Sequence, residues 1–257
     1  MPTLAVGDIP INYETAGAGA VTLCFVHGSG GNTGVWRQQM QGLADIARVV
    51  ALDLPGHGRS GGDGIASIED ATVVVRAVVE NLGPGRVVVV GHSMGGAVAQ
   101  MFALTHPERT AGLALIGTGA RLRVLPKIFA EIDQDHAAGA QFVTDLAVAS
   151  SAPAALKRKV HDETLRVSAR ILSGDFRACD RFDVMARLGD IAVPTLVVTG
   201  EEDQLTPPKY AEYLRAHIRG ARLVLVRGSG HYVQLERPDE VSRALREFVT
   251  SLRPVAA

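Results

Sequence analysis

Short runs of apolar, mostly β-branched residues recur along this 257-residue chain, and they constrain its fold more than any other feature. The runs lack the polar–apolar alternation of a strand with one solvated face, so we expect strands buried on both faces. Strands of this kind belong to parallel sheets that helices cover on both sides. The runs span residues 21–27, 49–53, 87–91, 113–116, 195–200 and 223–226.

Helical patterns separate these runs, as an α/β fold requires. They span residues 68–82, 94–104, 209–218 and 238–252, and the last has Pro238 in its first turn. Residues 4–15 are typical of an antiparallel hairpin that turns at Gly7 and Asp8. The predicted fold is therefore α/β, with a mostly parallel central sheet of about eight strands and helices on both faces.

The alternation of strand and helix stops between about residues 121 and 187. Only two of the 28 glycines lie there, and apolar residues follow a helical spacing, as in Ile128 and Ile132 or Phe142 and Leu146. We expect one core domain formed by residues 1–120 and 188–257, with residues 121–187 as a helical cap insertion.

The charges argue against two classes of partner. Lys and Arg total 26 and Asp and Glu total 27, so no broad basic field favours nucleic acid or an anionic membrane. No Lys or Arg precedes Arg37, which is unlike a secretory signal, and we expect a cytoplasmic protein. Cys24 and Cys179 show no metal-binding spacing, so no metal is expected.

The pattern Gly-x-Ser-x-Gly occurs twice. A nucleophilic serine in this pattern sits on a tight turn between a strand and a helix, with glycines where side chains would clash. Ser93, in Gly91–Gly95, follows four valines and precedes a helical pattern, whereas Ser60, in Gly58–Gly62, has glycine-rich loop on both sides. We interpret Ser93 as the candidate nucleophile and Ser60 as a loop residue.

With this turn in view, nearly the whole chain resembles the α/β-hydrolase fold family. The resemblance rests on the 91–96 turn, on the 27–31 sequence His-Gly-Ser-Gly-Gly after a strand, and on the 53–60 sequence Asp-Leu-Pro-Gly-His-Gly-Arg-Ser. It is specific for the fold and much less specific for the substrate.

The resemblance implies a catalytic triad in the order Ser, Asp or Glu, His. Of the eight histidines, His231 matches the family's base because it follows a strand within a glycine-rich loop. His27 and His57 lie in loops before the serine, where turn or packing roles are expected. Asp203 matches the carboxylate: it follows the 195–200 strand with the family's Gly-x-x-Asp spacing and a proline at 207.

The family also stabilises the transition-state oxyanion with two backbone N–H groups, which the resemblance assigns to Ser29 and Met94. Trp36, Phe129 and Phe142 are candidate substrate-pocket residues, although internal packing explains each of them as well.

These residues predict a serine hydrolase of small apolar carboxylic esters or lactones that needs no cofactor. Two other reactions remain open on the same triad, namely C–C bond hydrolysis and cofactor-free perhydrolysis. A small-molecule receptor on the same fold is the alternative from another class. A serine at the nucleophile position disfavours haloalkane dehalogenation. The sequence decides neither the substrate nor the oligomeric state.

Overall fold

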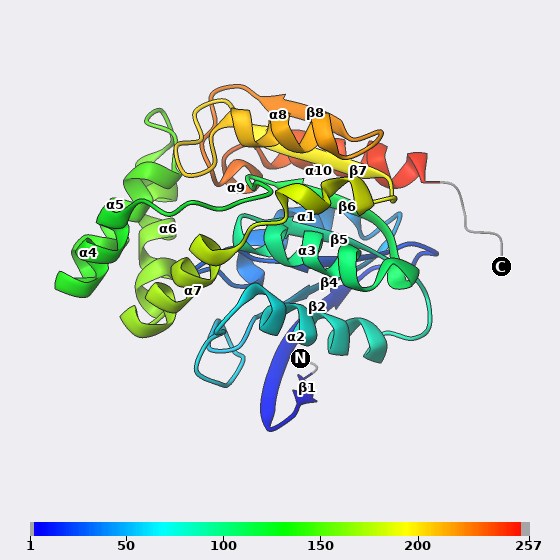
Figure 1. The fold of residues 1–257 in the computed structure, drawn as a ribbon, viewed down its shortest axis with the longest axis horizontal. Helices are drawn as coiled ribbons and strands as arrows, with labels where there is room; N and C mark the ends of the chain where they lie inside the picture. The colour runs from blue at the N-terminus through cyan, green and yellow to red at the C-terminus, as the bar shows by residue number, and fades with distance from the viewer. Residues whose placement is uncertain (1–2, 253–257) are drawn as a thin grey trace.

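The computed structural model describes residues 3–252, which contain one eight-stranded sheet (Figure 1). Its strands are β1 (Thr3–Val6), β2 (Ile9–Ala16), β3 (Thr22–Val26), β4 (Arg48–Leu52), β5 (Val87–His92), β6 (Thr110–Ile116), β7 (Thr195–Gly200) and β8 (Arg222–Val226). The strand order is β1-β2-β4-β3-β5-β6-β7-β8, and only the β1–β2 and β2–β4 pairs are antiparallel. The predicted fold class and the hairpin at Gly7 are confirmed.

Helices cover both faces of this sheet. They are α1 (Arg37–Leu43), α2 (Ile68–Asn81), α3 (Met94–Thr105), α4 (Pro126–Gln134), α5 (His136–Ala147), α6 (Ala154–Arg166), α7 (Ala169–Arg181), α8 (Pro208–His217), α9 (Val233–Glu236) and α10 (Pro238–Ser251). Sequence patterns predicted α2, α3, α8 and α10 to within about a turn, but α1 and α9 were not anticipated.

The central strand β5 shows why its sequence is uniformly apolar. Val87 and Val89 pack into the core beneath α2, α3 and α8, while Val88 and Val90 pack into the core beneath α1 and α10. All four side chains are at most 2% exposed. Because burial of one valine contributes about 1.5–3 kcal/mol, both layers favour the same apolar residues in this strand.

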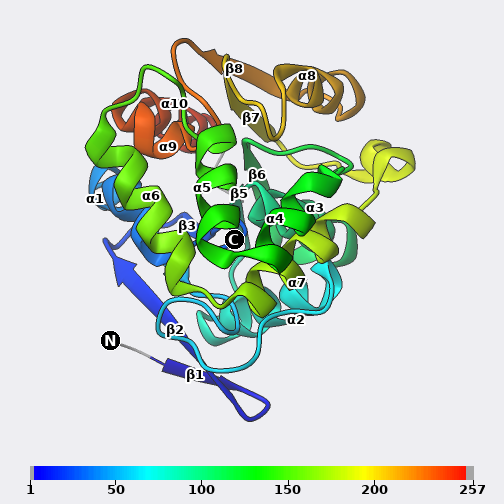
Figure 2. The same cartoon turned by 90° about the vertical axis from the view of Figure 1, so that its left-hand side faces the viewer.

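Helices α4–α7 follow β6 in the chain and lie together on one side of the core, at the left of Figure 1 and facing the viewer in Figure 2; we call them the cap. The cap has its own apolar core, which includes Ile132, Val143 and Leu172. Its helices begin at residues suited to this position: Pro126 opens α4, and Asp135 accepts hydrogen bonds from the Ala137 and Ala138 amides to cap α5. The cap lies within the predicted insertion 121–187.

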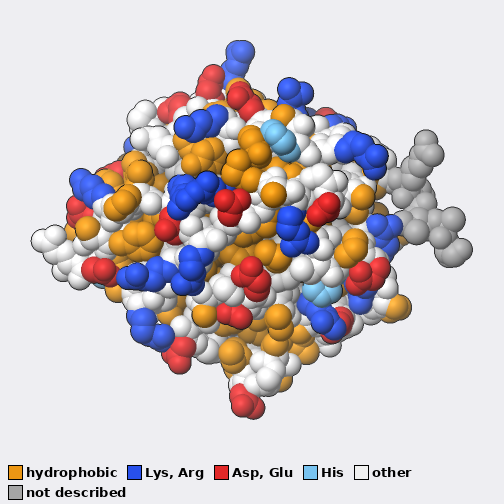
Figure 3. All heavy atoms as spheres, in the orientation of Figure 1, with side chains coloured by type: hydrophobic (Ala, Val, Ile, Leu, Met, Phe, Trp, Pro, Cys, Tyr) orange, Lys and Arg blue, Asp and Glu red, His pale blue; other side chains and the backbone are white. Residues whose placement is uncertain are grey.

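On the face shown in Figure 3, basic and acidic side chains are interspersed with apolar and uncharged ones. This distribution agrees with the net charge of −1. Among residues 3–252, no helix combines the length and the apolar character needed to cross a bilayer.

Candidate active site

Ser93 occupies the turn between β5 and α3. Its φ is 53°, the only positive φ of a non-glycine residue in the described part of the chain. A conformation of this kind costs about 1–3 kcal/mol and persists only where neighbouring structure enforces it. The neighbours here allow no side chain, because a Cβ at Gly91 would lie 2.0 Å from the Gly95 carbonyl oxygen. Only glycine fits at position 91, and the turn leaves Ser93 lining a cavity.

The second Gly-x-Ser-x-Gly serine has a different environment. Ser60 Oγ accepts a hydrogen bond from the Asn12 amide (2.9 Å) and donates one to the Asp53 carbonyl (2.6 Å). The two contacts join the loop to β2 and to the residue after β4, and Ser60 has a structural explanation that Ser93 lacks.

Asp203 and His231 are paired after the adjacent strands β7 and β8. His231 Nδ1 lies 2.9 Å from Asp203 Oδ2, and each residue is 3% exposed. The amides of Leu205 and Thr206 donate to Asp203 Oδ1 at 3.0 and 2.8 Å, and the Thr206 hydroxyl donates to Oδ2. A carboxylate that accepts these bonds makes Nδ1 of His231 the protonated nitrogen and leaves Nε2 free to accept a proton.

His92 connects this pair to the serine turn. Its ring centroid lies 4.7 Å from that of His231, and its Nε2 donates to the His231 carbonyl at 3.0 Å. Burial lowers the pKa of His92 well below its ordinary value of 6.5, with the nearby His231 adding to the effect. His92 is therefore neutral and places His231 beside the residue that precedes Ser93. Within residues 3–252, Ser93 Oγ makes no hydrogen bond to His231.

The loop that carries His231 is held from the cap and from α9. The His231 amide donates to the Ala147 carbonyl at the end of α5 (2.8 Å). The buried Glu236 carboxylate accepts from the amides of Gly230 and Ala149 at 3.0 and 3.1 Å. Burial raises the pKa of Glu236 above its usual range. Nothing in the sequence indicated a role for Glu236, because a glutamate in a helix of only four residues has no pattern that distinguishes it from an exposed surface glutamate.

The turn that contains Ser29 lies directly beside Ser93. A Cβ at Gly28 would lie 3.0 Å from Ser93 Cβ, so glycine permits this close approach. Ser29 Oγ lies 3.6 Å from Met94 Sδ, which places the two predicted oxyanion-binding residues side by side. Met94 is the first residue of α3, where a helix leaves its amides without an intrahelical acceptor.

Ser29 and Ser93 line a cavity of about 50 Å³ between the core and the cap. Its other lining residues are Leu122, Arg123, Val124, Leu125, Ile128, Phe176, Cys179, Gln204, Leu205 and Thr206. The lining is mostly apolar, as a site for a small organic substrate requires.

The three predicted pocket residues lie elsewhere. Trp36 is 0% exposed and packs against Phe25, with ring centroids 5.1 Å apart. Phe129 and Phe142 are half-buried beneath the side chains of Arg177 and Lys127. None of the three lines the cavity beside Ser93.

Helix geometry explains the position of Phe129. In α4 the inward face carries Ile128 and Ile132, and the next residue along a helix points about 100° away. From the cap, the residues that reach the cavity include Ile128 and Phe176 rather than the predicted phenylalanines.

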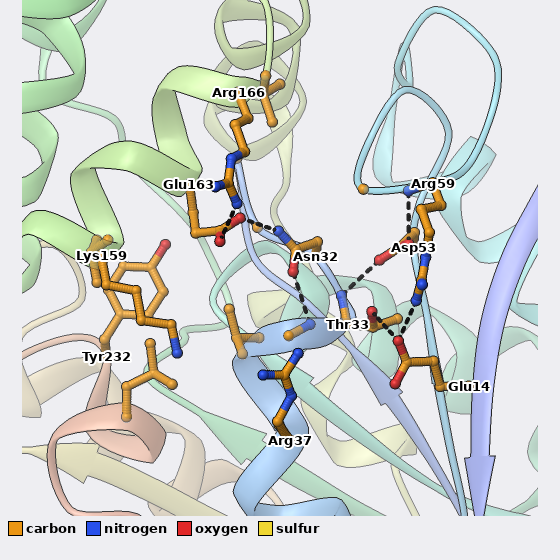
Figure 4. Close-up of a pocket in the computed structure, with 18 of the residues that line it drawn as sticks. Glu14, Asn32, Thr33, Arg37, Asp53, Arg59, Lys159, Glu163, Arg166 and Tyr232 are labelled. Atoms are coloured by element: carbon orange, nitrogen blue, oxygen red, sulfur yellow. Dashed lines mark hydrogen bonds and ion pairs between the residues drawn. The ribbon is translucent and has the colours of Figure 1, made fainter. Parts of the chain in front are cut away.

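A second cavity, of about 480 Å³, lies between α6 and the core and is drawn in Figure 4. Gly30 and Gly31 line it, but Ser93 does not. Several of its polar side chains pair with one another: Asn32 donates to Glu163 at 2.7 Å, and Glu163 accepts from Arg166 at 2.5 Å (Figure 4). These contacts join the loop after Ser29 to the cap.

Sequence reasoning also missed a buried acid–base pair. His57 Nε2 lies 2.9 Å from Asp175 Oδ2, and both side chains are 0% exposed. Asp175 belongs to α7, where it shares the buried face with Ile171, Leu172 and Cys179. An aspartate at helical spacing within an apolar face was the signal that could have found it.

Comparison with known proteins agrees with the geometry. A model of the alpha/beta hydrolase family matches residues 25–244. The chain is 30% identical over 252 residues to the pimeloyl-[acyl-carrier protein] methyl ester esterase of Edwardsiella ictaluri. The aligned region covers 92% of this chain and 96% of that protein. It is 27% identical to the 2-hydroxy-6-oxononadienedioate/2-hydroxy-6-oxononatrienedioate hydrolase of Paraburkholderia xenovorans, with 95% and 91% of the two chains covered.

Among solved structures, an N-acyl homoserine lactone degrading enzyme superposes with a TM-score of 0.87 at 29% identity, covering 96% of this chain and 100% of that one. The fold and the strained serine turn thus define a hydrolase-type protein. The chain belongs to the α/β hydrolase family.

Proposed function

We propose that this protein hydrolyses carboxylic ester or lactone bonds of small apolar substrates through a Ser93–His231–Asp203 triad. The observation that carries the proposal is the orientation of His231, whose Nδ1 faces the fixed Asp203 carboxylate at 2.9 Å and whose Nε2 is left to act as a base. The esterase and lactone-degrading relatives support the ester or lactone bond as the target.

The reaction proceeds in two acyl transfers. His231 Nε2 takes the Ser93 hydroxyl proton while Oγ bonds to the substrate carbonyl carbon, and the carbonyl electron pair moves onto oxygen. When the tetrahedral intermediate collapses, the C–O bond to the alcohol breaks and His231 returns the proton to the departing oxygen. Water then attacks the acyl-enzyme with the same base, which releases the acid and restores Ser93. Asp203 stabilises the imidazolium formed in each step.

The negative oxygen of each tetrahedral intermediate needs donors that are already in place. The amides of Ser29 and Met94 provide them, because they belong to a turn and a helix start that meet beside Ser93. No metal or organic cofactor takes part in this scheme. The small cavity beside Ser93 favours short acyl groups.

Hydrolysis of p-nitrophenyl acetate by the wild type and by Ser93→Ala tests the proposal. We expect Ser93→Ala to lose at least about three orders of magnitude in kcat/KM while it melts at the wild-type temperature. Ser60→Ala is the matched control because it removes the serine of the other motif. Equal rates for the wild type and Ser93→Ala would refute the proposal.

A second candidate reaction has its own support. The Paraburkholderia relative is named for a substrate with a ketone and no ester, so its hydrolysis breaks a C–C bond. The same triad would serve that reaction. Turnover of a 2-hydroxy-6-oxo dienoate by the wild type, with no turnover of acetate esters or lactones, would favour this candidate over the first.

A further inference from the structure

The buried carboxylate of Asp175 holds two loops of the core at once. Its Oδ2 accepts a hydrogen bond from the Gly30 amide at 3.0 Å and lies 2.9 Å from His57 Nε2. Gly30 directly follows Ser29, and His57 belongs to the loop after β4. One oxygen atom of the cap therefore joins the turn beside Ser93 to a second glycine-rich loop.

The contacts of His57 fix the number of protons that the pair holds. Nδ1 lies 3.0 Å from the Pro55 carbonyl oxygen, which can only accept, so Nδ1 carries a proton. Nε2 faces a carboxylate oxygen that also accepts from Gly30, so a second proton lies between Nε2 and Oδ2. We assign this second proton to Nε2, as an imidazolium that faces a carboxylate, because the charge and hydrogen bond of Asp175 favour the protonated ring.

His27 shows that this charge state is specific to His57. His27 Nδ1 faces the Gly28 carbonyl at 2.8 Å, while its Nε2 accepts from the Leu54 amide at 3.0 Å. One donor and one acceptor make His27 neutral, although its ring centroid lies 4.9 Å from that of His57.

The charged groups around His57 favour its protonation. They are Asp175 on α7 and Asp53 in its own loop, with neutral His27 on the third side. Burial alone would lower the pKa of His57, but the charge and hydrogen bond of Asp175, together with the Pro55 carbonyl and the Asp53 charge, outweigh burial and raise the pKa above 6.5. Asp53 is engaged elsewhere, since it accepts from the Thr33 amide at 2.7 Å and from Asn12 at 2.8 Å.

A side chain of the cap, that of Leu172, packs against the same turn. Gly30 has a φ of 66°, and a Cβ there would lie 3.0 Å from Leu172 Cδ1 of α7. The turn closes with a hydrogen bond from the Gly31 amide to the Gly28 carbonyl at 3.0 Å. A shift of α7 would therefore move the Gly30 amide and, with it, the turn that contains Ser29.

We propose that Asp175 and His57 are positioning residues for acyl transfer: the cap carboxylate, balanced by the His57 imidazolium, fixes the Gly28–Gly31 turn so that the Ser29 amide meets the oxyanion. This inference rests on the proposed function. It adds that the cap helps to fix the oxyanion site, and that a proton outside the triad is needed for full activity.

Asp175→Asn separates this role from the shape of the side chain. Without the Asp175 charge, burial favours a neutral His57 whose remaining proton stays on Nδ1. An amide oxygen at the Oδ2 position would then accept from Gly30 but face an unprotonated Nε2, and an amide nitrogen there would donate to Nε2 but face the Gly30 donor. Asparagine can therefore satisfy one neighbour and not both. Arg170→Gln is the matched control, because Arg170 on the same helix joins the cap to Asp63 through a surface ion pair at 2.6 Å.

With p-nitrophenyl acetate, we expect Asp175→Asn to lower kcat about 10- to 100-fold with KM changed less than threefold, because misplaced donors affect the transition state most. Arg170→Gln should stay within twofold of the wild type. Wild-type kcat should fall as pH rises through the raised pKa of His57, and Asp175→Asn should lack this alkaline decline. A folded Asp175→Asn protein with kcat within twofold of the wild type, or with the same alkaline decline, would overturn the inference.

Nuclear magnetic resonance of the wild-type protein tests the pair without activity and without a variant. Both ring nitrogens of His57 should be protonated at pH 6, and the Gly30 amide signal should shift with the same pKa as His57. A singly protonated His57 at pH 6, or a Gly30 amide signal that does not shift as His57 titrates, would refute the proposed ion pair. A wild-type protein that hydrolyses no ester or lactone would instead refute the proposed function, and this titration would be unaffected.

Discussion

Replacing Asp203 with asparagine should nearly abolish catalysis while leaving the fold intact. The amides of Leu205 and Thr206 donate to Oδ1, so the amide oxygen of asparagine will take that position and its NH₂ group will face His231. Nδ1 of His231 then faces two donors, the asparagine NH₂ group at about the present 2.9 Å and the Thr206 hydroxyl at 3.1 Å, so we expect Nδ1 to accept and the ring proton to move to Nε2. In this tautomer the nitrogen that should receive the Ser93 proton is already occupied.

The expected loss in kcat is about 10³- to 10⁴-fold, equivalent to roughly 4–5.5 kcal/mol of transition-state stabilisation. The assay is p-nitrophenyl acetate hydrolysis at pH 7, with melting temperature as the check on folding. Glu202→Gln is the control, because Glu202 is an exposed neighbour with the same change in charge. A folded Asp203→Asn protein that keeps more than a tenth of the wild-type kcat would refute the tautomer argument.

Three further outcomes follow from the same contacts. Ser60→Ala should keep wild-type kcat but lose about 1–2 kcal/mol of unfolding free energy in urea, since it leaves the Asn12 amide without its acceptor; a loss of activity would contradict the choice of Ser93. Burial lowers the pKa of His27 from 6.5 to about 4, so the neutral ring stabilises the fold fully above pH 6.5 and this stabilisation is lost as pH falls toward 4. Between pH 7 and 4 the unfolding free energy of the wild type should therefore fall by about 3 kcal/mol more than that of His27→Asn. Equal losses in the two proteins would contradict a neutral buried ring. Phe176→Ala should enlarge the cavity beside Ser93 and shift the kcat/KM preference from acetate toward butyrate or hexanoate p-nitrophenyl esters, whereas an unchanged preference would show that Phe176 does not limit the acyl group.

The sheet could be predicted from the sequence because burial on both faces leaves a direct pattern. The four valines of β5 divide between two cores, so each of them had to be apolar. The strained turn at Ser93 could be predicted equally well, because its glycines are required: a Cβ at Gly91 would lie 2.0 Å from a backbone oxygen. Helix α1 was missed because its sequence, Arg-Gln-Gln-Met-Gln-Gly-Leu, offers only two apolar positions.

The pocket was less predictable because it depends on which side of each cap helix faces the core. Phe129 and Ile128 are adjacent in the sequence, yet only Ile128 reaches the cavity beside Ser93. Asp175 was overlooked because its partners, Gly30 and His57, lie 145 and 118 residues away in the chain. The apolar face of α7 indicates that Asp175 is buried, but the residues that it contacts are set by the packing of the cap on the core.

The central claim is that His231 makes the Ser93 hydroxyl nucleophilic, and covalent labelling with a fluorophosphonate measures this directly. Mass spectrometry should find one phosphonyl group per chain, on the peptide that contains Ser93. His231→Ala should label at least 100-fold more slowly while remaining folded. Labelling at another residue, or an equal rate in the folded His231→Ala protein, would contradict the account.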